Sequence, residues 1–265
     1  DQPRSRGLGD VYKRQPWIGT SWKMNKTRSE ARAFAGALKT YQYSNVQPFV
    51  IPPFPYIAEV ADILSGTGVR VGAQNMHWET HGAWTGEVSP LMVKDCGASL
   101  VELGHSERRT HFGDTDETVA KKVAAAVRHG LTALVCIGDT RSEYEAGATA
   151  DVLARQTRYA LRDVGKSAPG KVIIAYEPVW SIGEGGIPAD PDFANAQHRM
   201  LKTLTAEIAG EPLPMLYGGS VNPQNCCSLA AMPDIDGLFI GRSAWEPAGF
   251  IGIIEAVTQS LGEKP

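Results

Sequence analysis

The feature of this sequence that most constrains its fold is an alternation of short apolar runs with amphipathic stretches, repeated eight times from Trp17 onward. The apolar runs predict strands at 17–22, 49–51, 69–74, 100–104, 131–137, 172–176, 214–217 and 237–240. The intervening stretches predict helices at 29–38, 55–64, 116–129, 149–164, 190–208, 222–232 and 247–261, with one more short helix after a long loop at 75–90. Eight such units favour a closed parallel barrel over a doubly wound open sheet.

The predicted fold is therefore an α/β protein, a (β/α)8 or TIM barrel, formed as a single domain by residues 16–265. Residues 1–15 stand apart because they are charged, rich in Gly and Arg, and aperiodic. The run D-V-Y-K-R-Q at 10–15 resembles the translation of a transposon adapter used in sequencing libraries. We expect 1–15 to be a non-native cloning or assembly scar, with a disordered native tail as the alternative.

Composition excludes several classes of function. The net charge of −3 gives no footprint for nucleic acid or for an anionic membrane. No apolar run approaches membrane-spanning length and no leader pattern is seen, so we expect a cytoplasmic protein. The cysteines have no metal-binding spacing and no nearby histidine pair, so we expect free thiols and neither metal nor cofactor: Cys96, Cys136, Cys226 and Cys227.

The stretch 171–186 is the first candidate for chemistry. It begins as a buried strand, places Glu177 at the end of that strand, and continues into a loop with an apolar tip at Ile182 and a glycine at Gly183. A carboxylate at the C-terminal end of a barrel strand, followed by a flexible loop, is typical of a general base under a lid. The alternative is an exposed glutamate at an ordinary strand-to-helix turn.

Other predicted strand ends carry polar groups as well. Lys23 follows the first strand and His105 the fourth, where a turn beginning at Ser106 would keep the imidazole neutral. Gly-containing ends of the last two strands, near Ser220 and Gly241, match the phosphate site common in such barrels. The alternatives are a surface lysine, a structural histidine and glycines that serve tight turns.

Together these groups are the parts of a proton-transferring isomerase. Glu177 would remove a proton from the carbon beside a carbonyl, and His105 would polarise that carbonyl and move protons between the two oxygens of an enediol. Lys23 would stabilise the negative charge that develops on oxygen, while the lid excludes water and holds the enediol phosphate away from elimination.

The same motifs resemble those of the triosephosphate isomerase family, for which a glutamate base and a neutral histidine electrophile are the known pattern. The resemblance covers about 17–262 and rests on W-K-M-N at 22–25, G-A-Q-N at 72–75, T-G-E-V-S-P at 85–90, G-H-S-E-R-R at 104–109, Y-E-P-V-W-S-I-G at 176–183 and Y-G-G-S-V at 217–221. It implies that His105 is the electrophile, Glu177 the base and Lys23 the electrostatic partner. It further implies a supporting carboxylate and two phosphate ligands: Glu107, Gly183 and Ser220.

The resemblance also bears on assembly. In the family, the loop that corresponds to 75–90 inserts into a neighbouring subunit beside that subunit's lysine and histidine, which implies a homodimer. The alternative is a loop that packs only on itself.

Departures from the usual family pattern fall in the predicted site. Ser21 replaces an asparagine, the lid continues as 183–189 G-E-G-G-I-P-A, and Gly241-Arg242 replaces a glycine pair. This set resembles the tetrulose-phosphate branch of the family, whose members convert L-erythrulose 1-phosphate to D-erythrulose 4-phosphate in erythritol catabolism. The alternatives are a triosephosphate isomerase that acts on dihydroxyacetone phosphate, and a barrel that binds sugar phosphates without turnover.

The chemistry of the tetrulose substrate suits these departures. L-Erythrulose 1-phosphate is dihydroxyacetone phosphate with an added CH2OH group, so the pocket needs room and a polar partner for one more carbon and hydroxyl. Ser21 offers volume, and Arg242 or Glu184 offers hydrogen bonding. Arg242 could equally add positive charge for the phosphate. An intact Lys23, His105 and Glu177 argue against a binder, which needs no acid–base pair.

Overall fold

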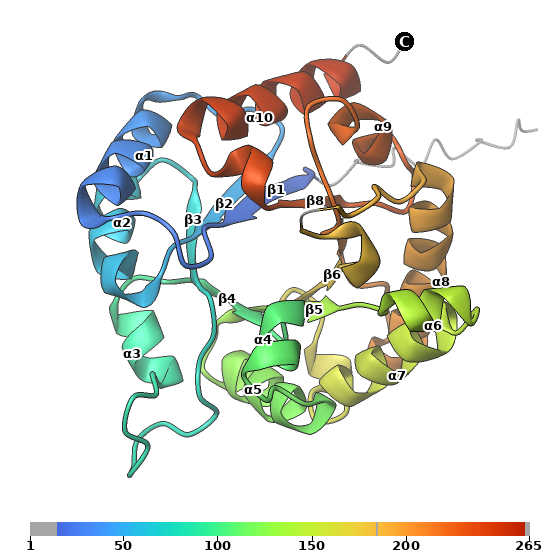
Figure 1. Ribbon diagram of the computed structural model, residues 1–265. Helices are drawn as coiled ribbons and strands as arrows, with labels where there is room; N and C mark the ends of the chain where they lie inside the picture. The colour runs from blue at the N-terminus through green and yellow to red at the C-terminus, as the bar shows by residue number, and fades with distance from the viewer. Residues whose placement is uncertain (1–14, 184, 263–265) are drawn as a thin grey trace, which may run out of the picture.

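A computed structural model of the chain describes residues 15–183 and 185–262, and its centre is a closed barrel of parallel strands (Figure 1). The strands are β1 (Trp17–Ser21), β2 (Gln47–Ile51), β3 (Arg70–Ala73), β4 (Leu100–Leu103), β5 (Thr132–Ile137), β6 (Val172–Tyr176), β7 (Met215–Tyr217) and β8 (Gly237–Ile240). Each strand pairs with its neighbours in chain order, and β8 closes the ring on β1, with Trp17 opposite Gly237. The predicted (β/α)8 barrel is confirmed.

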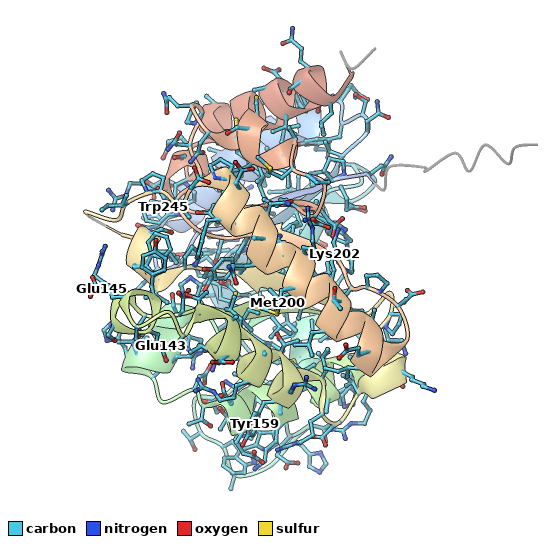
Figure 2. All side chains as sticks on the ribbon, turned by 90° about the vertical axis from the view of Figure 1, so that its right-hand side faces the viewer. Glu143, Glu145, Tyr159, Met200, Lys202 and Trp245 are labelled. Carbon is cyan, nitrogen blue, oxygen red and sulfur yellow. The ribbon has the colours of Figure 1, made fainter. Side chains whose placement is uncertain are left out.

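Helices surround the barrel as an outer ring (Figure 1). They are α1 (Arg28–Thr40), α2 (Ile57–Leu64), α3 (Pro90–Asp95), α4 (Ser106–His111), α5 (Asp116–Arg128), α6 (Arg141–Glu145), α7 (Thr149–Leu161), α8 (Pro191–Ala209), α9 (Cys226–Ala230) and α10 (Pro247–Gly262). Figure 2 shows α8, which carries Met200 and Lys202, lying obliquely across the outside of the barrel beside α7, with α6 near the rim. Helices α4 and α6 were not predicted from the sequence, because these short polar helices bury no residue and so have no apolar period.

The core has two layers. Between the barrel and the helices lies a large apolar layer in which Trp22, Phe34 and Phe250 are fully buried. Inside the barrel lies a smaller cluster formed by Phe49, Ile51, Leu100, Leu134, Cys136, Ile173, Ala175, Leu216 and Phe239. The ring of Phe49 fills the space beside Gly19, where a Cβ atom would lie 2.2 Å from the ring. The interior is thus a packed core and not a channel.

Strand alternation carries this inner layer up to the site. Ile173 and Ala175 point into the barrel, so the next inward position along the chain is Glu177. Leu100 also points inward, and the same rule places Glu102 inside the barrel one layer above it. The inner face therefore changes from apolar to polar toward the C-terminal ends of the strands.

The loop between β3 and α3 leaves the barrel and projects as an extended tip (Figure 1). The loop packs on itself, because the His77 ring contacts the rings of both Trp78 and Trp84, at centroid distances of 4.1 and 4.4 Å. Residues 81–87 at the tip are exposed.

Three further predictions from the sequence concern the N-terminal residues, membrane-spanning helices and the cysteines. The expectation for residues 1–15 falls, except at Gln15, outside the described residues. Among the helices that are described, none is long and apolar enough to cross a membrane. The four cysteines are free thiols, as expected.

Candidate active site

A cavity of about 200 Å³ opens at the C-terminal end of the barrel. Nine of the ten predicted site residues line it, and they come from the ends of β1, β4, β6, β7 and β8: Ser21, Lys23, His105, Glu177, Ile182, Gly183, Ser220, Gly241 and Arg242. The tenth, Glu107, lies beside the cavity and contacts Lys23 and His105. The barrel thus gathers residues that are far apart in the sequence.

Both the backbone and the ammonium group of Lys23 are held in place by other residues. Its backbone has a φ of 52°, a conformation that is uncommon for a residue other than glycine, and its carbonyl accepts a hydrogen bond from Gln74 Nε2 at 2.8 Å. Its ammonium group forms an ion pair with Glu107, with Nζ 2.6 Å from Oε1. Partial burial raises the pKa of Glu107, but the hydrogen bond and charge of Lys23 outweigh that effect and leave the pKa below its usual value.

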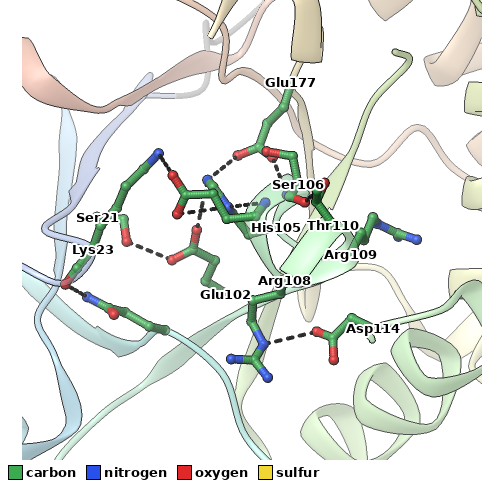
Figure 3. A network of polar contacts seen from close by, with 12 residues as sticks. Ser21, Lys23, Glu102, His105, Ser106, Arg108, Arg109, Thr110, Asp114 and Glu177 are labelled. Atoms are coloured by element: carbon green, nitrogen blue, oxygen red, sulfur yellow. Dashed lines mark hydrogen bonds and ion pairs between the residues drawn. The ribbon is translucent and has the colours of Figure 1, made fainter. Parts of the chain in front are cut away.

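His105 caps the N-terminus of α4, and this cap defines its tautomer. Its Nδ1 accepts a hydrogen bond from the backbone N–H of Glu107 at 3.1 Å. In a neutral ring the proton must then lie on Nε2, which is 3.4 Å from Glu177 Oε1 (Figure 3). The ring therefore presents an N–H donor to the carboxylate of Glu177 and to the cavity.

Glu177 is almost completely buried, with 2% of its side chain exposed. Its Oε2 accepts a hydrogen bond from the backbone N–H of Ser106 at 3.3 Å. On its other side lies Gly218, where a Cβ atom would come within 2.9 Å of Glu177 Cγ. A side chain at 218 would displace the carboxylate, so the glycine at the end of β7 is needed for close approach.

The segment after Glu177 is anchored at its base. The Trp180 ring stacks on Tyr144 of α6 at 4.3 Å, and its Nε1 donates to Asp139 Oδ2 at 3.2 Å. Beyond this anchor, Ile182 and Gly183 reach the cavity, and Gly183 has a φ of 85° that favours glycine. Glu184 lies outside the described residues.

The opposite wall of the cavity is built from the ends of β7 and β8. Backbone-rich turns at 218–221 and 240–243 line it together with the side chain of Trp245, whose Nε1 donates to the carbonyl of Ser21 at 3.0 Å. Exposed backbone N–H groups in such turns suit an anion. The guanidinium of Arg242 adds a positive charge to the same wall.

Glu102 is a site residue that the sequence analysis missed. It is buried, and its Oε2 accepts a hydrogen bond from Ser21 Oγ at 2.8 Å, while its Oε1 lies 3.9 Å from His105 Nε2 (Figure 3). Burial raises the pKa of Glu102 to about 7, and the nearby charge of Glu177 adds to that shift against the opposing effects of His105, Ser21 and Lys23. The inward alternation from Leu100 was the signal that could have identified it.

The raised pKa predicts how stability depends on pH. The folded protein binds the Glu102 proton more tightly than the unfolded chain does. The free energy of unfolding therefore falls as the pH rises from 4.5 through about 7. Glu102→Gln removes this loss. The free energy of unfolding of the variant, relative to that of the wild type, should therefore increase from pH 5 to pH 8 by roughly 3 kcal/mol at most. Denaturant unfolding at both pH values measures it, with the exposed Glu211→Gln as control. An advantage that is equal at the two pH values would contradict the prediction.

Among the described residues, one group of His, Cys, Asp or Glu side chains lies close enough to share a metal ion, namely Glu102, His105 and Glu177, with ligand atoms within 4.8 Å of one another. Two of them, His105 and Glu177, are side chains that the proton chemistry requires.

A buried carboxylate beside an imidazole N–H donor, with an ammonium group and a wall of turns suited to an anion in one barrel cavity, is typical of a sugar-phosphate isomerase site. Comparison with known proteins specifies the family. The family model for triosephosphate isomerase matches residues 16–257. The chain belongs to the triosephosphate isomerase family.

The chain is also similar to proteins named L-erythrulose-1-phosphate isomerase. It is 56% identical to the one from Brucella abortus biovar 1 (strain 9-941), over 242 residues that cover 90% of this chain and 94% of the relative. It is 55% identical to the one from Rhizobium rhizogenes (strain K84), over 249 residues that cover 92% and 95%. For Rhizobium meliloti (strain 1021) the identity is 53% over 251 residues, covering 92% and 98%.

Proposed function

We propose that this enzyme interconverts L-erythrulose 1-phosphate and D-erythrulose 4-phosphate through a cis-enediolate intermediate. The observation that carries the proposal is the pairing of Glu177 Oε1 with His105 Nε2 at 3.4 Å in a cavity that Lys23 and Ser220 also line. The similarity to relatives that bear the name of this activity supports the choice of substrate.

The reaction begins with removal of a proton from C3. Glu177 takes this proton, and the electron pair of the C–H bond moves into a C2–C3 double bond while the carbonyl oxygen at C2 becomes negatively charged. The ammonium group of Lys23 and the Nε2–H of His105 stabilise that charge. Because the cavity is small and Glu177 is buried, these interactions act with little competition from water.

The second half reverses the proton movement on the neighbouring carbon. His105 gives its Nε2 proton to the oxygen at C2 and takes one back from the hydroxyl at C3, so that the carbonyl moves to C3. Glu177, now protonated, returns its proton to C2. The product is D-erythrulose 4-phosphate, and every group of the enzyme is back in its starting state.

The remaining predicted residues bind the substrate in this scheme. Gly183, Ser220 and Gly241 would donate backbone or hydroxyl hydrogen bonds to the phosphate, and Arg242 would add charge. Ile182 would cover the enediolate, and Glu107 would support His105 and Lys23, with which it is in contact. A phosphate held in the plane of the enediolate cannot leave easily, which suppresses elimination.

A test of the proposal measures turnover of L-erythrulose 1-phosphate and of dihydroxyacetone phosphate by the wild type and by Glu177→Gln. We expect kcat/KM of the wild type to be higher for the four-carbon substrate. A preference for dihydroxyacetone phosphate would make the chain a triosephosphate isomerase, and no turnover of either would leave a sugar-phosphate-binding barrel.

We also propose that the protein is a homodimer through loop 75–90. The support is the exposed, projecting tip of this loop, on which Trp84 is 48% exposed, and the exposure of Met24 directly after Lys23 at 95%. Sedimentation analysis should give about twice the 28.5 kDa of one chain. Trp84→Glu should shift the protein toward monomer. A wild-type protein that sediments as a monomer would overturn the proposal.

The cellular setting follows from the substrate. L-Erythrulose 1-phosphate is an oxidised and phosphorylated form of erythritol, so we place the reaction in erythritol catabolism. Four free thiols, including Cys226 and Cys227 with their Sγ atoms 3.9 Å apart, support a reducing cytoplasm. The turnover measurement also tests this assignment, because a protein that does not act on the tetrulose phosphate cannot take part in erythritol catabolism.

A further inference from the structure

Two buried polar side chains meet inside the barrel below the predicted catalytic residues. Ser21 ends β1 and Glu102 lies on β4, and the two strands do not pair with each other. The 2.8 Å hydrogen bond from Ser21 Oγ to Glu102 Oε2 therefore bridges the interior of the barrel (Figure 3). Ser21 lines the cavity, and its hydroxyl group is hydrogen-bonded to Glu102.

The direction of this hydrogen bond determines what Ser21 offers to the cavity. A serine hydroxyl has one proton and two lone pairs. In this hydrogen bond Ser21 Oγ is the donor and Glu102 Oε2 the acceptor, so the Ser21 proton points to Glu102 and the lone pairs of Oγ remain for another partner. A substrate hydroxyl that reached Ser21 would find an acceptor already oriented.

The order of the strands indicates which part of the substrate comes here. The anion-binding wall is formed by the ends of β7 and β8. Glu102 lies on β4, opposite β8 in the ring, whereas Ser21 ends β1 beside β8 and directs its hydroxyl group toward Glu102. A phosphate on that wall leaves the rest of the substrate to extend toward β4, past Glu177 and His105. In a four-carbon ketose phosphate, the terminal hydroxymethyl group is the part farthest from the phosphate.

A purely structural role does not explain why a carboxyl group lies here. The layer directly below is apolar, with Leu100 two residues earlier on the same strand. A buried carboxyl group costs free energy that an apolar side chain of similar size would avoid. Such a cost is typical of groups that serve a binding or catalytic site.

We propose that Ser21 and Glu102 form the binding site for the terminal hydroxymethyl group of a four-carbon sugar phosphate. Ser21 Oγ accepts the hydrogen bond of the substrate hydroxyl, and Glu102 is a positioning residue that acts by orienting Ser21. This inference rests on the proposed tetrulose-phosphate activity. A three-carbon phosphate lacks the group and leaves the acceptor unpaired, which favours the longer substrate.

The test measures binding of two ligands that differ by one CHOH unit, erythritol 4-phosphate and glycerol 3-phosphate, by calorimetry. Ser21→Ala should weaken binding of erythritol 4-phosphate about 10- to 100-fold, the range for a lost hydrogen bond in a buried site. Glu102→Leu should lower the affinity for erythritol 4-phosphate about 10-fold, because the Ser21 hydroxyl group loses the partner that orients it. Glu102→Gln keeps an acceptor and should retain most of the affinity. Binding of glycerol 3-phosphate should change less than about threefold in each variant.

The double variant Ser21→Ala/Glu102→Leu separates this role from a structural one. If Glu102 acts through Ser21, the double variant loses no more affinity for erythritol 4-phosphate than Ser21→Ala alone. Equal losses for both ligands, or additive losses in the double variant, would overturn the inference. Turnover by the wild type distinguishes the two proposals. An enzyme that converts the tetrulose phosphate but fails these binding tests refutes only the role of the pair, and one that does not convert it refutes both.

Discussion

Glu177→Gln should lower kcat for L-erythrulose 1-phosphate by about 10³- to 10⁴-fold, the upper part of the range for loss of a general base. The amide has nearly the shape of the carboxylate but cannot take the proton from C3. The Cys136 thiol beside Glu177 is a poor replacement. Burial raises the pKa of the neighbouring Cys136 thiol well above its usual value, and the charges of Glu177 and Glu102 raise it further. Cys136 therefore stays protonated and cannot act as the base.

The same variant should still bind substrate. Glutamine has nearly the volume of glutamate and keeps one acceptor oxygen, for the Ser106 N–H or for the Nε2–H of His105. We expect erythritol 4-phosphate to bind within about fivefold of the wild type, because the lost function is proton transfer and not binding. Steady-state kinetics and calorimetry on one preparation check both statements. A kcat reduced less than tenfold would show that Glu177 is not the base.

Lys23→Met should reduce kcat/KM by about 10²- to 10³-fold, as for loss of one preorganised group that stabilises an oxyanion. Methionine has a similar length and apolar stem but no charge. The ammonium group needs little reorganisation during the reaction, because Glu107 holds it at 2.6 Å and Gln74 holds its backbone. Most of the loss should fall on kcat, since the charge that Lys23 stabilises develops only in the transition state.

A matched change tests whether the effect belongs to the substrate or to the ion pair. Glu107→Gln breaks the ion pair with Lys23 while leaving the ammonium group in place, and it should lower kcat/KM about tenfold or less, because the pair is half-exposed. If Lys23→Met raised KM and left kcat unchanged, Lys23 would serve ground-state phosphate binding and not the enediolate.

Much of the site could be predicted from the sequence because barrel chemistry is confined to the C-terminal ends of strands. Once Ile173 and Ala175 are assigned to a buried strand, Glu177 must follow at the mouth of the barrel. His105 follows β4 in the same way, and Lys23 follows β1. Each of these residues comes directly or shortly after an apolar run that is visible in the sequence.

Glu102 escaped the same reasoning because it lies within a strand and not after it. A carboxylate in the run Leu100–Leu103 interrupts the apolar pattern. Its burial is stabilised by groups far away in sequence, among them Ser21, which donates a hydrogen bond to it. The short helices α4 and α6 were missed for a related reason. Their contacts, such as the stacking of Tyr144 on Trp180, are made with distant parts of the chain.

The amino-acid sequence by itself determined the eightfold βα alternation, and with it the barrel and the strand ends that carry Lys23, His105 and Glu177. Local periodicity and residue type are enough for this, because they depend on neighbours within a few positions. Only the tertiary structure decided which side chains touch, among them the Nδ1 cap that leaves His105 with a proton on Nε2 and the bond from Ser21 to Glu102. Such contacts depend on the closure of the ring, which brings side chains of the unpaired strands β1 and β4 within hydrogen-bonding distance inside the barrel.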